Sequence, residues 1–125
     1  MQVMLCVFLG GGLGALARYL LVNLVLSNGT IMRIPFAILS VNLLGSLLIG
    51  LLAGFFSRES SASLLQPFLI VGFLGGFTTF SSFSLENFDL IRDGLPWAAL
   101  ANILASVVGG ILLAALGFSL TYRSA

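Results

Sequence analysis

Charged side chains are so sparse in this chain that long uncharged stretches lie between them. Three stretches cover residues 34–57, 60–85 and 94–122, which are 24, 26 and 29 residues long. A helix that spans a bilayer needs roughly 20 mostly apolar residues. We therefore expect an all-α membrane protein with four transmembrane helices, at about residues 3–26, 35–56, 67–90 and 96–120. These helices occupy most of residues 1–125, so we expect a single domain.

The composition excludes most other classes of protein. Only 7% of the residues are charged, against about 25% in a typical soluble domain. With no histidine and a single cysteine, Cys6, the chain cannot build a Cys/His zinc site or a Ser-His-Asp triad. It also lacks a basic cluster for nucleic acid. We therefore expect no enzyme and no nucleic-acid binding, but a multi-pass protein surrounded by membrane lipid.

The arginines leave the orientation in the membrane open. Four spans put both chain ends on one side, with Arg58 and Arg123, while Arg33 and Arg92 fall on the other. Because an excess of positive residues on one side normally sets orientation, two readings remain. Either a weak charge bias that this count does not resolve sets one orientation, or the chain inserts in both orientations and copies of opposite orientation pair. A bundle of this size has little interior for a transport path, which favours an oligomer.

Small residues and polar residues both recur at helical spacing. Lipid does not drive helices together as water does, so close approach over small residues is important. We expect helix contacts at Gly10/Gly14, Gly11/Ala15, Gly50/Gly54, Gly72/Gly76, Ala101/Ala105/Gly109 and Gly110/Ala114. Polar residues share faces in the second span (Asn42, Gly45, Ser46) and the fourth (Asn102, Ser106, Gly110). Each polar face fits either hydrogen bonding between helices or an ion path.

The third span is a poor helix near its centre. Gly75-Gly76 and Thr78-Thr79 are unfavourable helix formers, so we expect a break there, in the middle of the membrane. Such irregular backbone is tolerated only where it is buried in protein or lines a cavity. Phe80 and Phe83 follow, three residues apart. Their positive ring edges could contact an anion, although packing alone also explains phenylalanines in a membrane protein.

The few charges favour an anion over a cation as the transported species. The acidic residues of the third span, Glu86 and Asp89, come late in it. A proton-coupled exporter of cationic drugs needs a carboxylate at membrane depth, and none is evident. Arg18 lies within the first span. Its side chain could extend to the membrane surface or form an electropositive vestibule that draws anions.

Three motifs give the chain a family resemblance. They are GGGLGALARY at residues 10–19, VNLLG at residues 41–45 and GFLGGFTTFSSFSLE at residues 72–86. Together they resemble the Fluc (CrcB) family of microbial fluoride channels, and the resemblance covers essentially the whole chain. It implies a passive fluoride exporter of the bacterial plasma membrane that reduces fluoride toxicity. It also implies an antiparallel homodimer of dual-topology subunits with a buried sodium ion at its centre.

The resemblance assigns roles to individual residues. The sodium ligands correspond to the backbone carbonyls of Gly75 and Thr78, and Arg18 corresponds to the vestibule. The implied fluoride pathway comprises Asn42, Phe80, Phe83, Ser81, Ser82, Ser106, Asn102 and Glu86. Some relatives carry tyrosine in place of Asn102 and serine in place of Gly110, so this part of the pathway differs here. The alternatives are a small multidrug-type proton-coupled exporter and a membrane scaffold that transports nothing.

Overall fold

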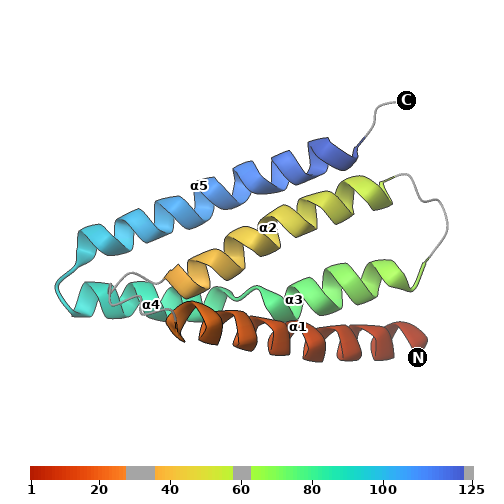
Figure 1. Cartoon of the computed structure of the whole chain (residues 1–125), viewed down its shortest axis with the longest axis horizontal. Helices are drawn as coiled ribbons and strands as arrows, with labels where there is room; N and C mark the ends of the chain where they lie inside the picture. Colours follow the sequence, from red (N-terminus) through yellow and green to blue (C-terminus); the bar gives the residue numbers. More distant parts are fainter. Residues whose placement is uncertain (28–35, 58–62, 123–125) are drawn as a thin grey trace.

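The helices of the chain run alternately in opposite directions and form one bundle (Figure 1). The computed structural model describes residues 1–27, 36–57 and 63–122. Helix α1 (Gln2–Ser27) is followed by α2 (Phe36–Phe56), then by a third rod made of three segments, and finally by α5 (Pro96–Thr121). The segments of the third rod are η1 (Pro67–Leu74), α3 (Gly75–Phe77) and α4 (Phe80–Arg92). Helix α1 begins and α5 ends at the same end of the bundle.

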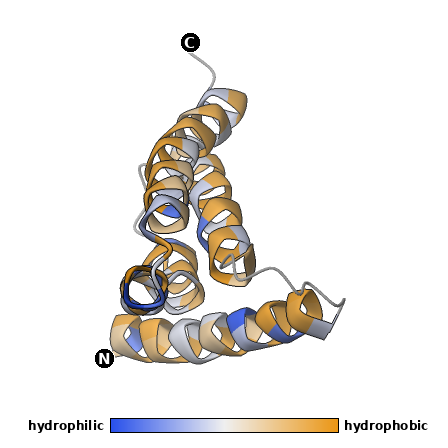
Figure 2. Cartoon of the chain, turned by 90° about the vertical axis from the view of Figure 1, so that its left-hand side faces the viewer, coloured by the Kyte–Doolittle hydropathy of each residue, from blue (hydrophilic) through white to orange (hydrophobic). Residues whose placement is uncertain are grey.

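The four rods that the structure describes are each long and apolar enough to span a membrane, as the sequence predicted. They cover Gln2–Ser27, Phe36–Phe56, Pro67–Arg92 and Pro96–Thr121. Hydrophobic residues make up most of the helices (Figure 2), and many of the large ones are exposed. Three of the four arginines on which the orientation argument depends, at positions 33, 58 and 123, lie outside the described residues. The two readings of the orientation therefore stay open.

Two pairs of neighbouring helices build most of the bundle. Helix α5 packs along α2, and α1 packs along η1 and α3. Close backbone approach makes this packing possible: a Cβ atom at Gly14 would meet the backbone of Phe73, with the carbonyl carbon at 2.9 Å. A Cβ atom at Gly50 would meet Ala114, with its carbonyl carbon at 2.8 Å. In lipid the hydrophobic effect does not hold helices together, so close contacts of this kind stabilise their association.

The glycine stripes confirm most of the predicted helix contacts. Backbone of a neighbouring helix lies against Gly10, Gly14, Gly50, Gly54, Gly72 and Gly76. The stripe in the fourth span is different, since Ala101 and Ala105 are exposed in the single chain. Whether these two alanines contact a helix of another copy stays a prediction.

Replacing Gly50 by valine is expected to separate α2 from α5. The added side chain meets the backbone of Ala114 rather than a movable side chain, and overpacking of this kind costs about 1–3 kcal/mol. Thermal unfolding in detergent should show a lower midpoint than for the unmodified chain. Gly12→Val is the matched control, because a Cβ atom at Gly12 meets nothing within 4 Å. Equal midpoints for the two variants would contradict this account of the packing.

The third rod departs from a regular α-helix in two places. Residues Pro67–Leu74 form a π-helix, which the sequence did not predict. Further along, the helical conformation is interrupted: Thr78 has φ −79° and ψ 156°, and Thr79 has φ −148° and ψ 122°. Both residues are therefore extended. Gly75 and Gly76 remain helical, so the interruption falls at the threonines alone.

Candidate functional site

The interruption between α3 and α4 has its hydrogen bonds supplied by side chains. The Leu74 carbonyl accepts both the Thr78 backbone N–H and the Thr78 hydroxyl, each at 2.9 Å. Thr79 is the N-cap of α4: its Oγ1 accepts the Ser82 N–H at 3.3 Å. Threonine is a favoured N-cap because its oxygen satisfies one of the free N–H groups at a helix start. The paired threonines thus end one helix and begin the next.

The Asn42 side chain of α2 forms hydrogen bonds with the backbone of the extended segment. The Thr79 N–H donates to Asn42 Oδ1 at 3.0 Å, and Asn42 Nδ2 donates to the Thr79 carbonyl at 3.3 Å. The side-chain amide thus pairs with the backbone of Thr79 as a neighbouring β-strand would. Because the Thr79 N–H bonds to Asn42, it does not donate to the Gly75 carbonyl four residues back. The sequence left open whether Asn42 bonds to another helix, and the structure shows that it does.

Arg18 of α1 reaches the same segment from the other side. Its Nη1 donates to the Thr78 carbonyl at 3.3 Å. The guanidinium therefore binds a backbone carbonyl of a residue that is extended and not helical. Asn42 and Arg18 together bind both peptide groups that the interruption exposes, from two different helices.

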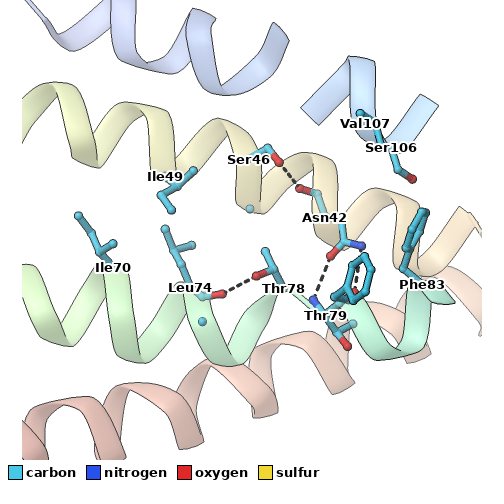
Figure 3. A pocket seen from close by; sticks show the side chains of 13 residues that line it. Asn42, Ser46, Ile49, Ile70, Leu74, Thr78, Thr79, Phe83, Ser106 and Val107 are labelled. Atoms are coloured by element: carbon cyan, nitrogen blue, oxygen red, sulfur yellow. Dashed lines mark hydrogen bonds between the residues drawn. The ribbon is translucent and has the colours of Figure 1, made fainter. Parts of the chain in front are cut away.

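A cavity of about 410 Å³ opens beside the interruption. Figure 3 shows its walls, which come from α2, from the third rod on both sides of the break, and from α5. Its lining residues are Asn42, Gly45, Ser46, Ile49, Ile70, Leu74, Gly75, Thr78, Thr79, Phe80, Phe83, Ser106 and Val107. None of these residues carries a charge. The lining consists of apolar side chains and neutral hydrogen-bonding groups.

The hydroxyl groups of the lining differ in what they can still donate. Ser46 donates to the Asn42 carbonyl at 2.8 Å, Thr78 donates to Leu74, and the Thr79 hydroxyl is within 3.2 Å of Ser82 Oγ. The Ser106 Oγ is buried and has no hydrogen-bond partner among the described residues. One Nδ2 hydrogen of Asn42 also remains, since an amide has two. Ser106 and Asn42 therefore hold donors in the cavity wall that no described residue uses.

The cavity brings together six of the eleven residues to which the family resemblance assigns roles. Asn42, Gly75, Thr78, Phe80, Phe83 and Ser106 all line it. The rings of Phe80 and Phe83 lie 5.9 Å apart between centroids, tilted by 39°. Five others lie outside this lining: Arg18, Ser81, Ser82, Glu86 and Asn102. Ser82 bonds to Thr79 and Ser81 is exposed. Whether these five take part in ion movement stays a prediction.

One polar residue of the third rod escaped the sequence argument. Asn87 is 5% exposed and Asn102 is 3% exposed. Asn102 Nδ2 donates to Asn87 Oδ1 at 3.0 Å, and Asn87 Nδ2 donates to the Phe83 carbonyl at 2.7 Å. An asparagine within an apolar span is itself a signal of a polar contact. Asn87 was missed because its partner, Asn102, is on a different helix. The spacing of residues along one helix does not show which residue of another helix they contact.

No charged side chain of the described residues is part of the cavity lining. Within residues 1–27, 36–57 and 63–122, no group of three or more His, Cys, Asp or Glu side chains could hold a metal ion. Arg92 pairs with Asp89 at 2.9 Å and with Asp93 at 3.5 Å, all largely exposed. Exposed pairs of this kind contribute little to stability. The lining of the cavity offers neutral donors and backbone carbonyls.

Comparison with known proteins agrees with the motif resemblance. A protein of Methylobacillus flagellatus named fluoride-specific ion channel FluC is 47% identical over 120 residues, which is 95% of this chain and 93% of the relative. A protein of the same name from Dichelobacter nodosus is 43% identical over 94% of this chain and 95% of its own length. A Yersinia pestis protein named fluoride-specific ion channel FluC 1 is 45% identical, over 95% and 93%.

These bacterial relatives, together with the four helices able to span a membrane, make the chain a multi-pass protein of the bacterial plasma membrane. The family model described as CrcB-like protein, Camphor Resistance (CrcB), matches residues 5–118. With this match over most of the chain and relatives above 40% identity, the chain belongs to the CrcB-like protein family.

Proposed function

We propose that this chain is a fluoride-selective channel that lets fluoride leave the cell passively and so reduces fluoride toxicity. The observation that carries the proposal is the cavity beside the break in the third rod, whose lining is uncharged and offers neutral donors. The relatives named fluoride-specific ion channels support the choice of ion. The protein acts as a transporter and not as an enzyme.

The cavity suits a small, strongly hydrated anion. Such an ion enters only where protein donors replace its water, and it leaves only where binding is weak enough for release. Ser106 and the free Nδ2 hydrogen of Asn42 supply donors without a formal charge. The edges of Phe80 and Phe83 add positive partial charge at the same cavity. Arg18 is bonded at Thr78 and outside the lining, where it can attract anions without trapping them.

Ion release from liposomes tests the proposal directly. Purified protein is reconstituted into liposomes loaded with equal fluoride and chloride, and efflux is followed with ion-selective electrodes. We expect fluoride to leave far faster than chloride, with protein-free liposomes as the control. Equal release of the two ions would contradict selectivity. Release of neither would favour a membrane scaffold.

Replacing Ser106 by alanine is expected to slow fluoride efflux more than the same change at Ser46. The Ser106 hydroxyl is free to bind the ion, whereas the Ser46 hydroxyl already donates to Asn42. Loss of one hydrogen bond of about 0.5–1.5 kcal/mol corresponds to a change of about 2- to 10-fold. The two variants are compared in the liposome assay. Equal efflux from both would contradict the assignment of Ser106 as the donor.

The functional unit in this proposal is an antiparallel homodimer of dual-topology subunits. Phe80 lines the cavity yet is 79% exposed, and Gly75 is also exposed. This wall of the cavity therefore lies at the surface of the single chain, and a second copy placed against it would shield the ion path from lipid. In the membrane, the break would then lie near the middle of the bilayer, next to the partner.

Labelling from each side of the membrane tests the dual topology. Cys6→Ser removes the native thiol, and Ser27→Cys places a new thiol at the exposed end of α1. In intact cells, a membrane-impermeant thiol reagent should label about half of the copies if opposite insertions pair as C2-type dimers. Labelling of all copies or of none would show a single orientation.

The residues expected to hold sodium are compatible with a hard cation. The Gly75 carbonyl lacks its usual helical donor, because the Thr79 N–H bonds to Asn42. The Thr78 carbonyl accepts from Arg18, and a carbonyl oxygen has a second lone pair. Carbonyl oxygens suit hard cations, and two from each copy would supply four. A bound sodium ion would hold the two copies together, so its exchange for a large organic cation should weaken the dimer in detergent.

The proton-coupled exporter is the weaker alternative. It requires a carboxylate that titrates within the transport path, and the cavity lining contains none. The family match also supports a fluoride channel rather than that exporter. Drug-dependent proton flux in the same liposomes would favour the exporter.

A further inference from the structure

Two buried asparagines connect α4 to α5 next to the cavity. Asn102 of α5 donates to Asn87 of α4 at 3.0 Å, and both residues are at least 95% buried. Asn87 donates in turn to the Phe83 carbonyl at 2.7 Å. Burying an amide is unfavourable unless it is hydrogen-bonded, so each asparagine requires the other. We call this pair the amide bridge.

The position of the amide bridge relates it to both walls of the cavity. Asn87 lies four residues after Phe83 on α4, and Asn102 lies four residues before Ser106 on α5. Residues four apart share one helix face, one turn along. Phe83 and Ser106 line the cavity, whereas Asn87 and Asn102 do not. The bridge therefore joins the two helices one turn away from the ring and the hydroxyl.

The hydrogen-bond directions show what the bridge can do. The Asn102 amide nitrogen points to Asn87, and its Oδ1 is buried with no partner among the described residues. An oxygen acceptor repels an anion, so this orientation suits a supporting residue better than a fluoride ligand. Asn87 also binds the backbone carbonyl of Phe83, the residue whose ring lines the cavity. The bridge is thereby connected to the backbone that carries this ring.

We propose that Asn87 and Asn102 are positioning residues that hold α4 against α5 and thereby set the separation between the Phe83 ring and the Ser106 hydroxyl. This inference rests on the proposed fluoride channel. A wider separation would leave a partly dehydrated fluoride ion without one of its contacts while admitting a larger anion. The amide bridge is therefore expected to control both the rate of fluoride passage and its preference over chloride.

The test compares Asn87→Leu, Asn102→Leu and the double variant in the liposome assay, with thermal unfolding measured alongside. Each single variant should lower fluoride efflux by about tenfold, since displacements of about 1 Å at enzyme sites can cost up to about 100-fold. The fluoride-to-chloride ratio should fall as well. In the double variant both partners are apolar, so the unfolding midpoint should recover, whereas efflux and selectivity should stay low.

Asn23→Leu on α1 is the matched control, because Asn23 is exposed, and it should behave like the unmodified chain. Single variants with unchanged efflux would overturn the inference. So would a double variant in which efflux recovers together with the unfolding midpoint, since the bridge would then serve stability alone. If single variants fail to fold, the double variant decides between these outcomes. Absence of fluoride efflux from the unmodified chain would instead contradict the proposed function itself.

Discussion

Replacing Asn42 by leucine is expected to reduce fluoride efflux by at least about 100-fold. The change removes both hydrogen bonds to Thr79 and leaves a backbone N–H and a backbone carbonyl without partners. Each unpaired buried group costs about 1–3 kcal/mol, and each 1.4 kcal/mol is about tenfold in an equilibrium. The extended segment should then rearrange, and the cavity would also lose the free N–H of Asn42. Fluoride release from liposomes is the measurement.

Two further variants accompany Asn42→Leu, one at the same position and one as a control. Asn42→Asp keeps an acceptor for the Thr79 N–H, so this variant should still fold. It adds negative charge beside the anion path, so its fluoride efflux should be low. Asn23→Leu repeats the first substitution at an exposed position of α1 and should leave efflux unchanged. Normal efflux from Asn42→Leu would show that neither the bonds to Thr79 nor the free N–H is needed.

The second large effect is expected at the two phenylalanine rings of the cavity. Phe80→Ile and Phe83→Ile keep an apolar side chain but remove the positive ring edge. If a ring edge contributes about as much to the ion as it does to an aromatic pair, about 0.5–1.5 kcal/mol, efflux should fall by up to about tenfold for each ring. Because the rings lie 5.9 Å apart and both line the cavity, one ion can contact both, so the double variant should be less active than either single one.

Phe88 provides the control for this prediction. It lies on α4, is 59% exposed and does not line the cavity, so Phe88→Ile tests the loss of a ring without a change at the site. Size-exclusion chromatography should give one elution volume for all the variants. Efflux from Phe83→Ile equal to that from Phe88→Ile would remove the Phe83 ring from the mechanism.

The spans were predictable because they depend on length and polarity. A stretch of more than 20 uncharged residues has few alternatives to a helix in lipid. The π-helix at Pro67–Leu74 was not predictable, since its residues are apolar and suit either kind of helix. The break was expected at Gly75-Gly76 and Thr78-Thr79 together, yet only the threonines leave the helix. Gly76 stays helical and packs against the Gly11 backbone, a contact that local propensity does not encode.

The site was predictable in its residue types and less so in its contacts. Asn42 and Ser106 stood out as polar residues within spans, and both line the cavity. The partner of Asn42 is 37 residues away at Thr79, a distance at which spacing along a helix says nothing. The same reason explains Asn87, whose partner Asn102 is on α5. Bonds between helices require the three-dimensional packing, which one sequence without its fold does not provide.

The π-helix at Pro67–Leu74 has a consequence for how this chain tolerates changes in length. Each turn of a π-helix holds more residues than a turn of an α-helix, because its hydrogen bonds join residues five apart. Loss of one residue there can be absorbed by tightening to α-helical bonding, which keeps the break and Phe83 in place. Helix α5 cannot absorb a deletion in this way, because loss of one residue rotates every following side chain by about 100° around the helix axis. Length variation among relatives should therefore collect in η1.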